Sequence, residues 1–161
     1  MAPFAAREWS GPVEENAFRD DGDGIVDWVH FEKSRAELGP GFIRILGYFR
    51  EDGAKSVARI EQAMRDQDTV ALVIPAHTLK GESQQFGANP LGEVAERIED
   101  VARSCIETHR FPDELVPDVV ELRRMFNVTV ELFDKATNPL MTRSQPAGFG
   151  RRPSNQEFGR I

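Results

Sequence analysis

Residues 69–86 have the sequence TVALVIPAHTLKGESQQF, which divides into two distinct faces when it is wound as a helix. At about 100° per residue, apolar or small side chains fall on one face at spacings of four, three, four and three. His77 falls on the opposite face, together with Lys80 and Gly81. We therefore predict a helix over 69–86 that packs through one side and presents His77 on the other. The packing side consists of Leu72, Ala76, Leu79, Ser83 and Phe86.

Gly81 is an unexpected residue in the middle of such a helix. A helix-interior glycine costs about 1 kcal/mol relative to alanine, but its missing side chain lets another protein approach the ring of His77. Lys80, on the same face, would attract an anion that this ring carries. A neutral imidazole is nucleophilic, and its ordinary pKa near ~6.5 keeps it mostly neutral at cellular pH. The three residues predict a histidine that holds a phosphoryl group and is visited by a partner.

Three apolar residues, Val70, Val73 and Ile74, lie on the same stripe as His77. A solvent-facing apolar patch usually marks an interaction site, so we predict that these residues bind the partner. The alternative is that the leader or the first helix covers them. Gln84, one turn beyond Gly81, is assigned to the same partner-binding face, and its bulk bears on how closely a partner packs.

Pro75 lies two residues before His77 and lacks the N–H group that would bond the carbonyl of Ala71. We expect either a bend at this point or a helix that starts only at Pro75. A late start would remove the patch from the helix and leave the pattern of His77, Lys80 and Gly81 intact.

Helical periodicity extends over most of the chain, and no segment of the body alternates as a strand does. Long helices joined by short loops pack as antiparallel neighbours. We predict the all-α class: an up-down four-helix bundle with an additional short N-terminal helix and irregular tails. The expected helices span about 27–38, 41–66, 69–86, 90–107 and 113–136. The expected organisation is an irregular leader (1–25), the bundle (26–137) and a flexible basic tail (138–161).

The octapeptide AHTLKGES (76–83) is followed by Phe86-Gly87-Ala88, by Leu91 and by Ile98-Glu99. In this order and at this spacing, the residues resemble the signature of the histidine-containing phosphotransfer (HPt) domain family. The resemblance implies that Nε2 of His77 accepts a phosphoryl group from the aspartate of one receiver domain and passes it to that of another. It also implies that Glu99 orients the imidazole through its other nitrogen.

The same resemblance implies that the chain is a phosphoryl carrier and not an enzyme. The receiver domain would supply the Mg²⁺, so the chain needs no cofactor of its own. The expected partners are response-regulator receiver domains and a histidine kinase or hybrid kinase. The overall expectation is an intermediate of a multistep, two-component phosphorelay.

Two other functions compete with this one. A helical adaptor or inhibitor would bind receiver or kinase domains without transferring phosphate. The dimerisation module of a histidine kinase is usually a two-helix hairpin that pairs into a dimer; here one chain supplies enough helices for its own bundle, so we expect a monomer.

Cys105 and His109 are spaced like half a metal site, but no second pair accompanies them, and we expect no metal.

The composition narrows the class of protein further. The chain has 161 residues and a net charge of −7, and its last 24 residues carry four arginines against one glutamate. The body is therefore strongly acidic, which argues against nucleic-acid binding. No apolar run approaches the ~20 residues of a membrane span, and the first residues lack a signal-peptide core. A single cysteine excludes an internal disulfide, and we expect a cytoplasmic protein.

Overall fold

The computed structural model describes residues 24–138 and residue 140. Over these residues the regular structure is helical, with no strand, which confirms the predicted all-α class. Of the predicted basic tail only Asn138 and Leu140 are described, and of the predicted leader only Gly24 and Ile25; the rest of both segments lies outside the described residues. The helices are α1 (Trp28–Leu38), α2 (Phe42–Arg65), α3 (Thr69–Gln85), α4 (Asn89–Glu107) and α5 (Val116–Thr137), with 3-10 turns at Gly39–Gly41 and Asp113–Leu115.

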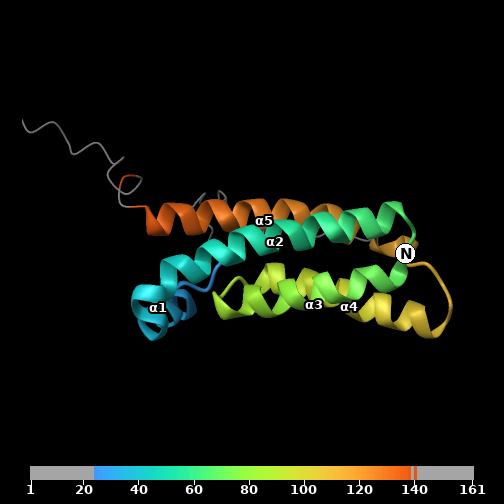
Figure 1. Ribbon diagram of the computed structural model, residues 1–161, viewed down its shortest axis with the longest axis horizontal. Helices are drawn as coiled ribbons and strands as arrows, with labels where there is room; N and C mark the ends of the chain where they lie inside the picture. Colours follow the sequence, from blue (N-terminus) through green and yellow to red (C-terminus); the bar gives the residue numbers. More distant parts are fainter. Residues whose placement is uncertain (1–23, 139, 141–161) are drawn as a thin grey trace, which may run out of the picture.

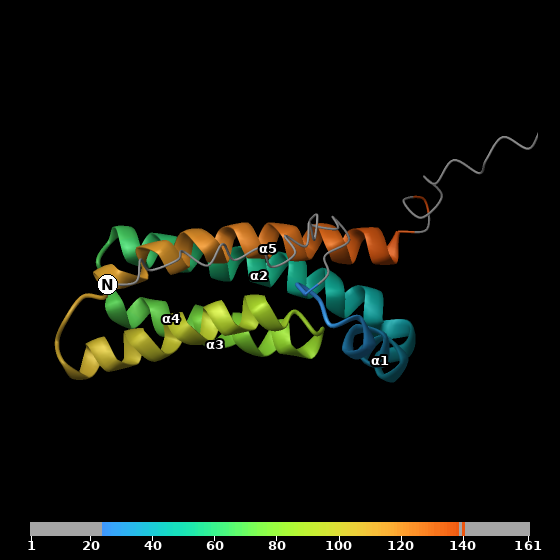
Figure 2. The same cartoon turned by 180° about the vertical axis from the view of Figure 1, so that it is seen from behind.

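Helices α2 to α5 run up and down and form a four-helix bundle, with α2 and α5 in one layer and α3 and α4 in the other (Figures 1 and 2). α3 packs against α2 and α4, and α5 packs against α4 and α2, so the four helices close into a ring. The short helix α1 lies at one end of this ring (Figure 1). The predicted bundle with its additional N-terminal helix is confirmed. Within the described residues, no helix is both long and apolar enough to cross a membrane.

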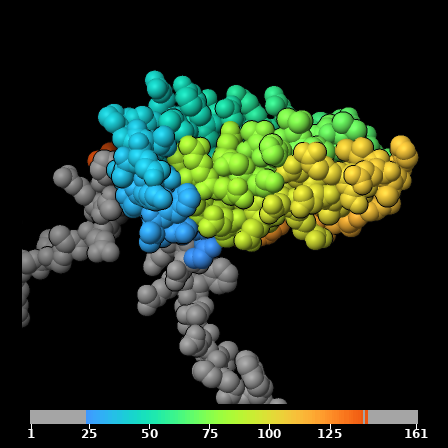
Figure 3. All heavy atoms as spheres, turned by 90° about the horizontal axis from the view of Figure 1, so that it is seen from below, coloured from blue at the N-terminus to red at the C-terminus, as the bar shows by residue number. Residues whose placement is uncertain are grey.

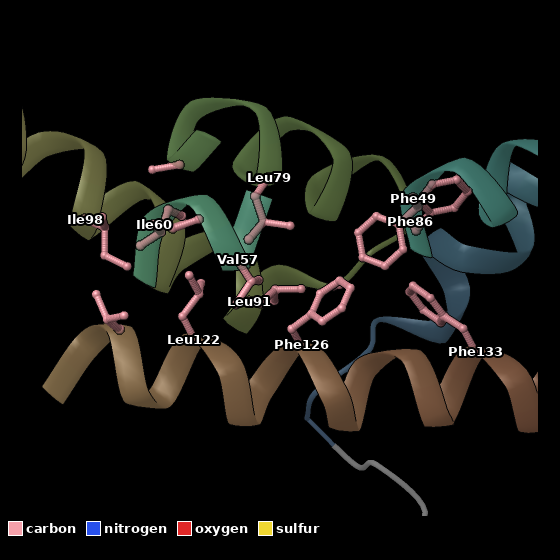
Figure 4. Packing of buried hydrophobic residues seen from close by; sticks show 14 of the residues in the cluster. Phe49, Val57, Ile60, Leu79, Phe86, Leu91, Ile98, Leu122, Phe126 and Phe133 are labelled. Atoms are coloured by element: carbon pink, nitrogen blue, oxygen red, sulfur yellow. The ribbon is translucent and has the colours of Figure 1, made fainter. Parts of the chain in front are cut away.

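Aromatic rings fill the end of the core that lies nearest α1 (Figure 4). Phe49 of α2, Phe86 and Phe133 of α5 lie with ring centroids 5.6–6.1 Å apart in edge-to-face contacts. Phe31 of α1 stacks on Phe133 at 5.0 Å, which anchors α1 to the bundle. Each fully buried phenylalanine contributes about 1.5–3 kcal/mol, so this cluster is a major source of the stability of that end.

The ends of α1 and α3 are fixed by local hydrogen bonds. Asp27 accepts from the backbone N–H of His30, and Asp68 accepts from that of Ala71, so each aspartate caps one helix start. The turn after α3 needs a glycine, because Gly87 has a φ of +77° and an added Cβ would lie 2.6 Å from the Asp27 carbonyl oxygen. This turn leads directly into α4.

The predicted start of α3 at residue 69 is confirmed, and the helix runs from Thr69 to Gln85 with Pro75 inside it. Of the two alternatives at Pro75, the late start is therefore wrong. Ala71, whose carbonyl loses its helical partner, is exposed, so water can satisfy it. α5 begins at Val116, after a 3-10 turn, with Pro117 in its first turn, where the missing N–H costs nothing.

Candidate functional site

His77 is exposed on the outer side of α3, and its ring contacts Glu99 of α4. Figure 3 shows the face of the bundle that α3 and α4 form together. The side chain of His77 is 61% exposed. The opposite side of α3 is buried throughout, as the spacing of its apolar residues predicted. The buried residues on that side are Leu72, Ala76, Leu79, Ser83 and Phe86.

One nitrogen of the His77 imidazole forms a hydrogen bond within the described structure, and the other does not. Nδ1 lies 3.0 Å from Oε1 of Glu99, which α4 supplies. An ionised carboxylate can only accept, so Nδ1 carries the proton and donates it to Glu99. Nε2 makes no hydrogen bond to any of the described residues, and in the neutral ring with its proton on Nδ1 it holds the lone pair. The geometry thus presents a nucleophilic nitrogen to solvent.

Glu99 is a buried carboxylate, with 5% of its side chain exposed, and three basic groups surround it. Besides His77, Nζ of Lys80 lies 2.9 Å from Oε2, and Arg103 donates from Nε and Nη2 to Oε1 at 3.1 and 2.9 Å. Burial alone raises the pKa of Glu99, but Lys80, Arg103 and His77 together outweigh it and hold that pKa at about 2. Glu99 therefore stays ionised at any physiological pH.

Lys80 is the second cationic group of the site and is more enclosed than the sequence suggested. Its side chain is 21% exposed, and its ammonium group lies between Glu99 and Glu96, 3.7 Å from the latter. The Glu99 carboxylate raises the pKa of Lys80, partly opposed by desolvation. Lys80 is thus fully charged and held one turn from His77. Its predicted contact with a phosphoryl group stays a prediction.

Gly81 is exposed, and a Cβ added to it would meet no heavy atom within 4 Å. Its helical backbone has no positive φ that would demand glycine. By contrast, a Cβ at Gly53 would lie 2.6 Å from Cε2 of Phe126. The folded chain requires a glycine at 53 for packing and none at 81. Position 81 therefore faces solvent, and the absence of a side chain there affects only a molecule that binds to this side of α3.

The predicted apolar patch is only partly present. Val70 and Ile74 are 65% and 70% exposed, and α1 lies at the other end of α3, so it does not cover them. Val73 is 8% exposed and belongs to the core, so its placement on the exposed stripe was wrong. The reason is that Val73 lies seven residues before Lys80 and shares the flank of α3 that packs on α4. Gln84 is exposed, as predicted.

The sequence-based reasoning missed Arg103. This residue lies four positions after Glu99, one turn along α4, where side chains of opposite charge meet. That spacing is visible in the sequence and was the available signal. The side chain of Arg103 is 54% exposed, against 21% for Lys80, so Arg103 is the more accessible of these two cations that pair with Glu99. The structure therefore brings His77, Lys80, Glu99 and Arg103 into one cluster across α3 and α4.

The ionised Glu99 predicts an acid-dependent loss of stability. The carboxyl has a pKa of about 2 in the folded chain against an ordinary 4.5, so the unfolded chain binds a proton first as the pH falls. The stabilisation is complete above about pH 5 and is lost toward pH 2, on the order of 3 kcal/mol in all. We expect E99Q to be less stable at pH 7 and to lose less on acidification, as measured by urea unfolding at a series of pH values.

The matched control for this prediction is E114Q. The pKa of Glu114 is also lowered to about 2, by the Arg110 guanidinium beside it, but this pair is exposed. Solvent screens such a pair, so we expect its removal to change the stability and its acid dependence far less than the removal of the Glu99 carboxylate does. An E114Q variant whose acid dependence changed as much as that of E99Q would contradict the prediction.

The Hpt domain family model matches residues 44–127 of the chain. Among solved structures, the fold is similar to that of histidine-containing phosphotransfer protein B (HptB) from Pseudomonas aeruginosa PAO1. That similarity has a TM-score of 0.62 and 22% identity, and it covers 70% of this chain and 94% of the other. No curated protein matches the chain. The residues matched by the family model include His77, Lys80, Gly81 and Glu99.

Proposed function

The chain belongs to the Hpt domain family, and we propose that it is a phosphorelay intermediate that carries a phosphoryl group on Nε2 of His77. The group comes from the aspartyl phosphate of one receiver domain and passes to the aspartate of another. The observation that carries this proposal is the imidazole itself, 61% exposed, with Nδ1 on Glu99 and Nε2 directed to solvent. A buried ring, or one with both nitrogens in hydrogen bonds, would not support this reaction.

In the proposed step, the lone pair of Nε2 forms a bond to phosphorus. The bond from phosphorus to the aspartyl oxygen of the receiver breaks, and the aspartate leaves as a carboxylate with the electron pair. The ring keeps its Nδ1 proton and gains positive charge, which the Glu99 carboxylate stabilises at 3.0 Å. The reverse step returns the phosphoryl group to a second aspartate and restores the neutral ring.

Lys80 is assigned the electrostatic part of the reaction. Phosphoryl transfer depends mainly on positioning and on compensation of the charge on the equatorial oxygens. The Lys80 ammonium is fully charged and lies one turn from the ring. The described residues offer no further catalytic group next to Nε2, so we propose that the receiver domain supplies the Mg²⁺ and the remaining groups. In this scheme the chain is a carrier and not an enzyme, and it works as a monomer.

The exposed pair Val70 and Ile74 is proposed as part of the surface that binds the receiver domain. Both lie on the His77 side of α3, Ile74 one turn and Val70 two turns before it, and both leave most of their apolar surface in water. A receiver whose aspartate reaches Nε2 must cover this part of α3.

We expect I74D to weaken transfer from a phosphorylated receiver about tenfold or more, because a carboxylate would be desolvated in the contact. The measurement is the transfer rate as a function of receiver concentration. The matched control is V120D on α5, where the native valine is 67% exposed, close to the 70% of Ile74. If both variants transfer at the rate of the unmodified chain, the contact surface lies elsewhere.

The proposed function is tested by incubating the chain with a panel of radiolabelled, phosphorylated receiver domains. We expect some receivers to lose label to the chain and the label to be labile in acid, as an N–P bond is. An adaptor or inhibitor would bind receivers and acquire no label, so binding without labelling would overturn the proposal.

A further inference from the structure

Oε1 of Glu99 has two basic neighbours that compete for it. Nδ1 of His77 lies 3.0 Å away, and the two Arg103 nitrogens lie 3.1 and 2.9 Å away. Lys80, on the other oxygen, is shared with Glu96. Among the described residues, Arg103 thus forms its ion pair with Glu99 alone, whereas Lys80 divides its charge between two carboxylates.

A carboxylate 3.0 Å from an imidazole favours the protonated, positively charged ring. A protonated ring has no lone pair and accepts no phosphoryl group. The charged groups that face this part of the site are Lys80 from α3 and, from α4, Glu96, Glu99, Asp100 and Arg103. Without Arg103, one ammonium group would face three carboxylates, and the surroundings of the ring would be distinctly negative.

We propose that Arg103 is a positioning residue that balances the charge of Glu99 and so keeps the His77 ring neutral and nucleophilic at neutral pH. The proposal rests on the proposed function of His77 and adds to it a residue that acts through Glu99. Arg103 also fixes the carboxylate, because its two N–H groups hold Oε1 at the position from which it accepts the Nδ1 proton. The chain thereby orients the ring without protonating it.

The first test is an NMR titration of the histidine rings in the full chain. The chain has three histidines, and H77Q identifies the signal of His77 by its loss. In R103A we expect the titration midpoint of the His77 signals to rise by about half a pH unit. The midpoints of His30 and His109 should stay unchanged. R103K keeps the charge and should return the midpoint most of the way to that of the unmodified chain.

The matched control is R97A. Arg97 lies on the same helix, is similarly exposed, and bonds Asp118 of α5 at 2.7 Å instead of Glu99. This variant removes the same charge from α4 at a site away from the carboxylate, and the midpoint of His77 should not move. An R103A midpoint equal to that of the unmodified chain, or an R97A shift as large as that of R103A, would overturn the proposal.

The second test measures phosphorylation of His77 by phosphoramidate, a small donor that needs no docking surface. In this reaction Nε2 forms the bond to phosphorus and ammonia leaves. The ratio of the R103A rate to the unmodified rate should be well below one near pH 6.5 and should rise to one or above near pH 8.5. Taking the ratio at each pH cancels the ionisation of the donor. A ratio that is low and independent of pH would overturn the proposal and make Arg103 a direct contact of the phosphoryl group.

These tests separate the inference from the function on which it rests. If the unmodified chain gains no label from receiver domains, the proposed function fails, whatever the titration of His77 shows. If the unmodified chain is labelled normally and the R103A midpoint is unchanged, only the role of Arg103 fails.

Discussion

The H77Q variant should gain no acid-labile phosphoryl label from any receiver domain that labels the unmodified chain. Glutamine is uncharged and similar in size, but its amide has no nucleophilic nitrogen, so the N–P bond cannot form. The expected loss is complete, down to the background of the assay. The measurement is radiolabel retained by the chain after separation from the receiver.

The fold of H77Q should remain intact, which makes the loss of label interpretable. The side chain at 77 is 61% exposed, and Glu99 keeps its ion pairs with Lys80 and Arg103 when the imidazole is removed. The stability should change by about 1 kcal/mol or less. Retained label on H77Q would show that another residue accepts the phosphoryl group, and a loss of helical signal would contradict the expectation that the fold remains intact.

Enlarging Gly81 should separate the stability of the chain from its transfer reaction. A Cβ at this position meets nothing within 4 Å, and alanine is a better helix former by about 1 kcal/mol. We therefore expect G81A to be more stable than the unmodified chain by about 0.5–1 kcal/mol. G81Q, with a longer side chain beside His77, should slow transfer from receivers tenfold or more, since it keeps the partner from closing on the ring.

The same variants should react normally with phosphoramidate, because a small donor reaches Nε2 without covering Gly81. G53A provides the matched control for the stability measurement. There the added methyl group would lie 2.6 Å from a ring carbon of Phe126, so it should destabilise the chain by about 1–3 kcal/mol. A G81Q variant that receives phosphate from receivers at the unmodified rate would show that no partner approaches at this point.

Much of the fold followed from periodicity. The spacing of Leu72, Ala76, Leu79 and Ser83 separated a buried side of α3 from an exposed one, and the structure buries these residues completely. At Pro75 the sequence left two outcomes open, a bend or a late helix start, and the structure excludes the late start because the helix continues through Pro75. A buried ring that packs in the core offsets one missing backbone bond, and no local rule contains that tertiary contribution.

The site was predictable where one helix defines it and not where two helices meet. His77 and Gly81 were placed correctly on the outer side of α3 from winding alone. Val73 was not, because the flank that α4 covers depends on how the two helices pack. The same packing buries Glu99 and brings His77 and Lys80 of α3 to its carboxylate. A carboxylate that binds three basic groups is a tertiary feature, and spacing in one segment cannot reveal it.

In the proposed relay, one imidazole nitrogen carries the phosphoryl group between receivers. This transfer can be followed by mixing the chain with an equimolar phosphorylated receiver domain and locating the group by mass spectrometry under non-acidic conditions. We expect the chain to gain a single phosphoryl group on His77 as the receiver loses one, and a second receiver then to remove it. Release of the phosphate to water while the chain remains unmodified, or a phosphoryl group on any other residue, would rule out His77 as the carrier.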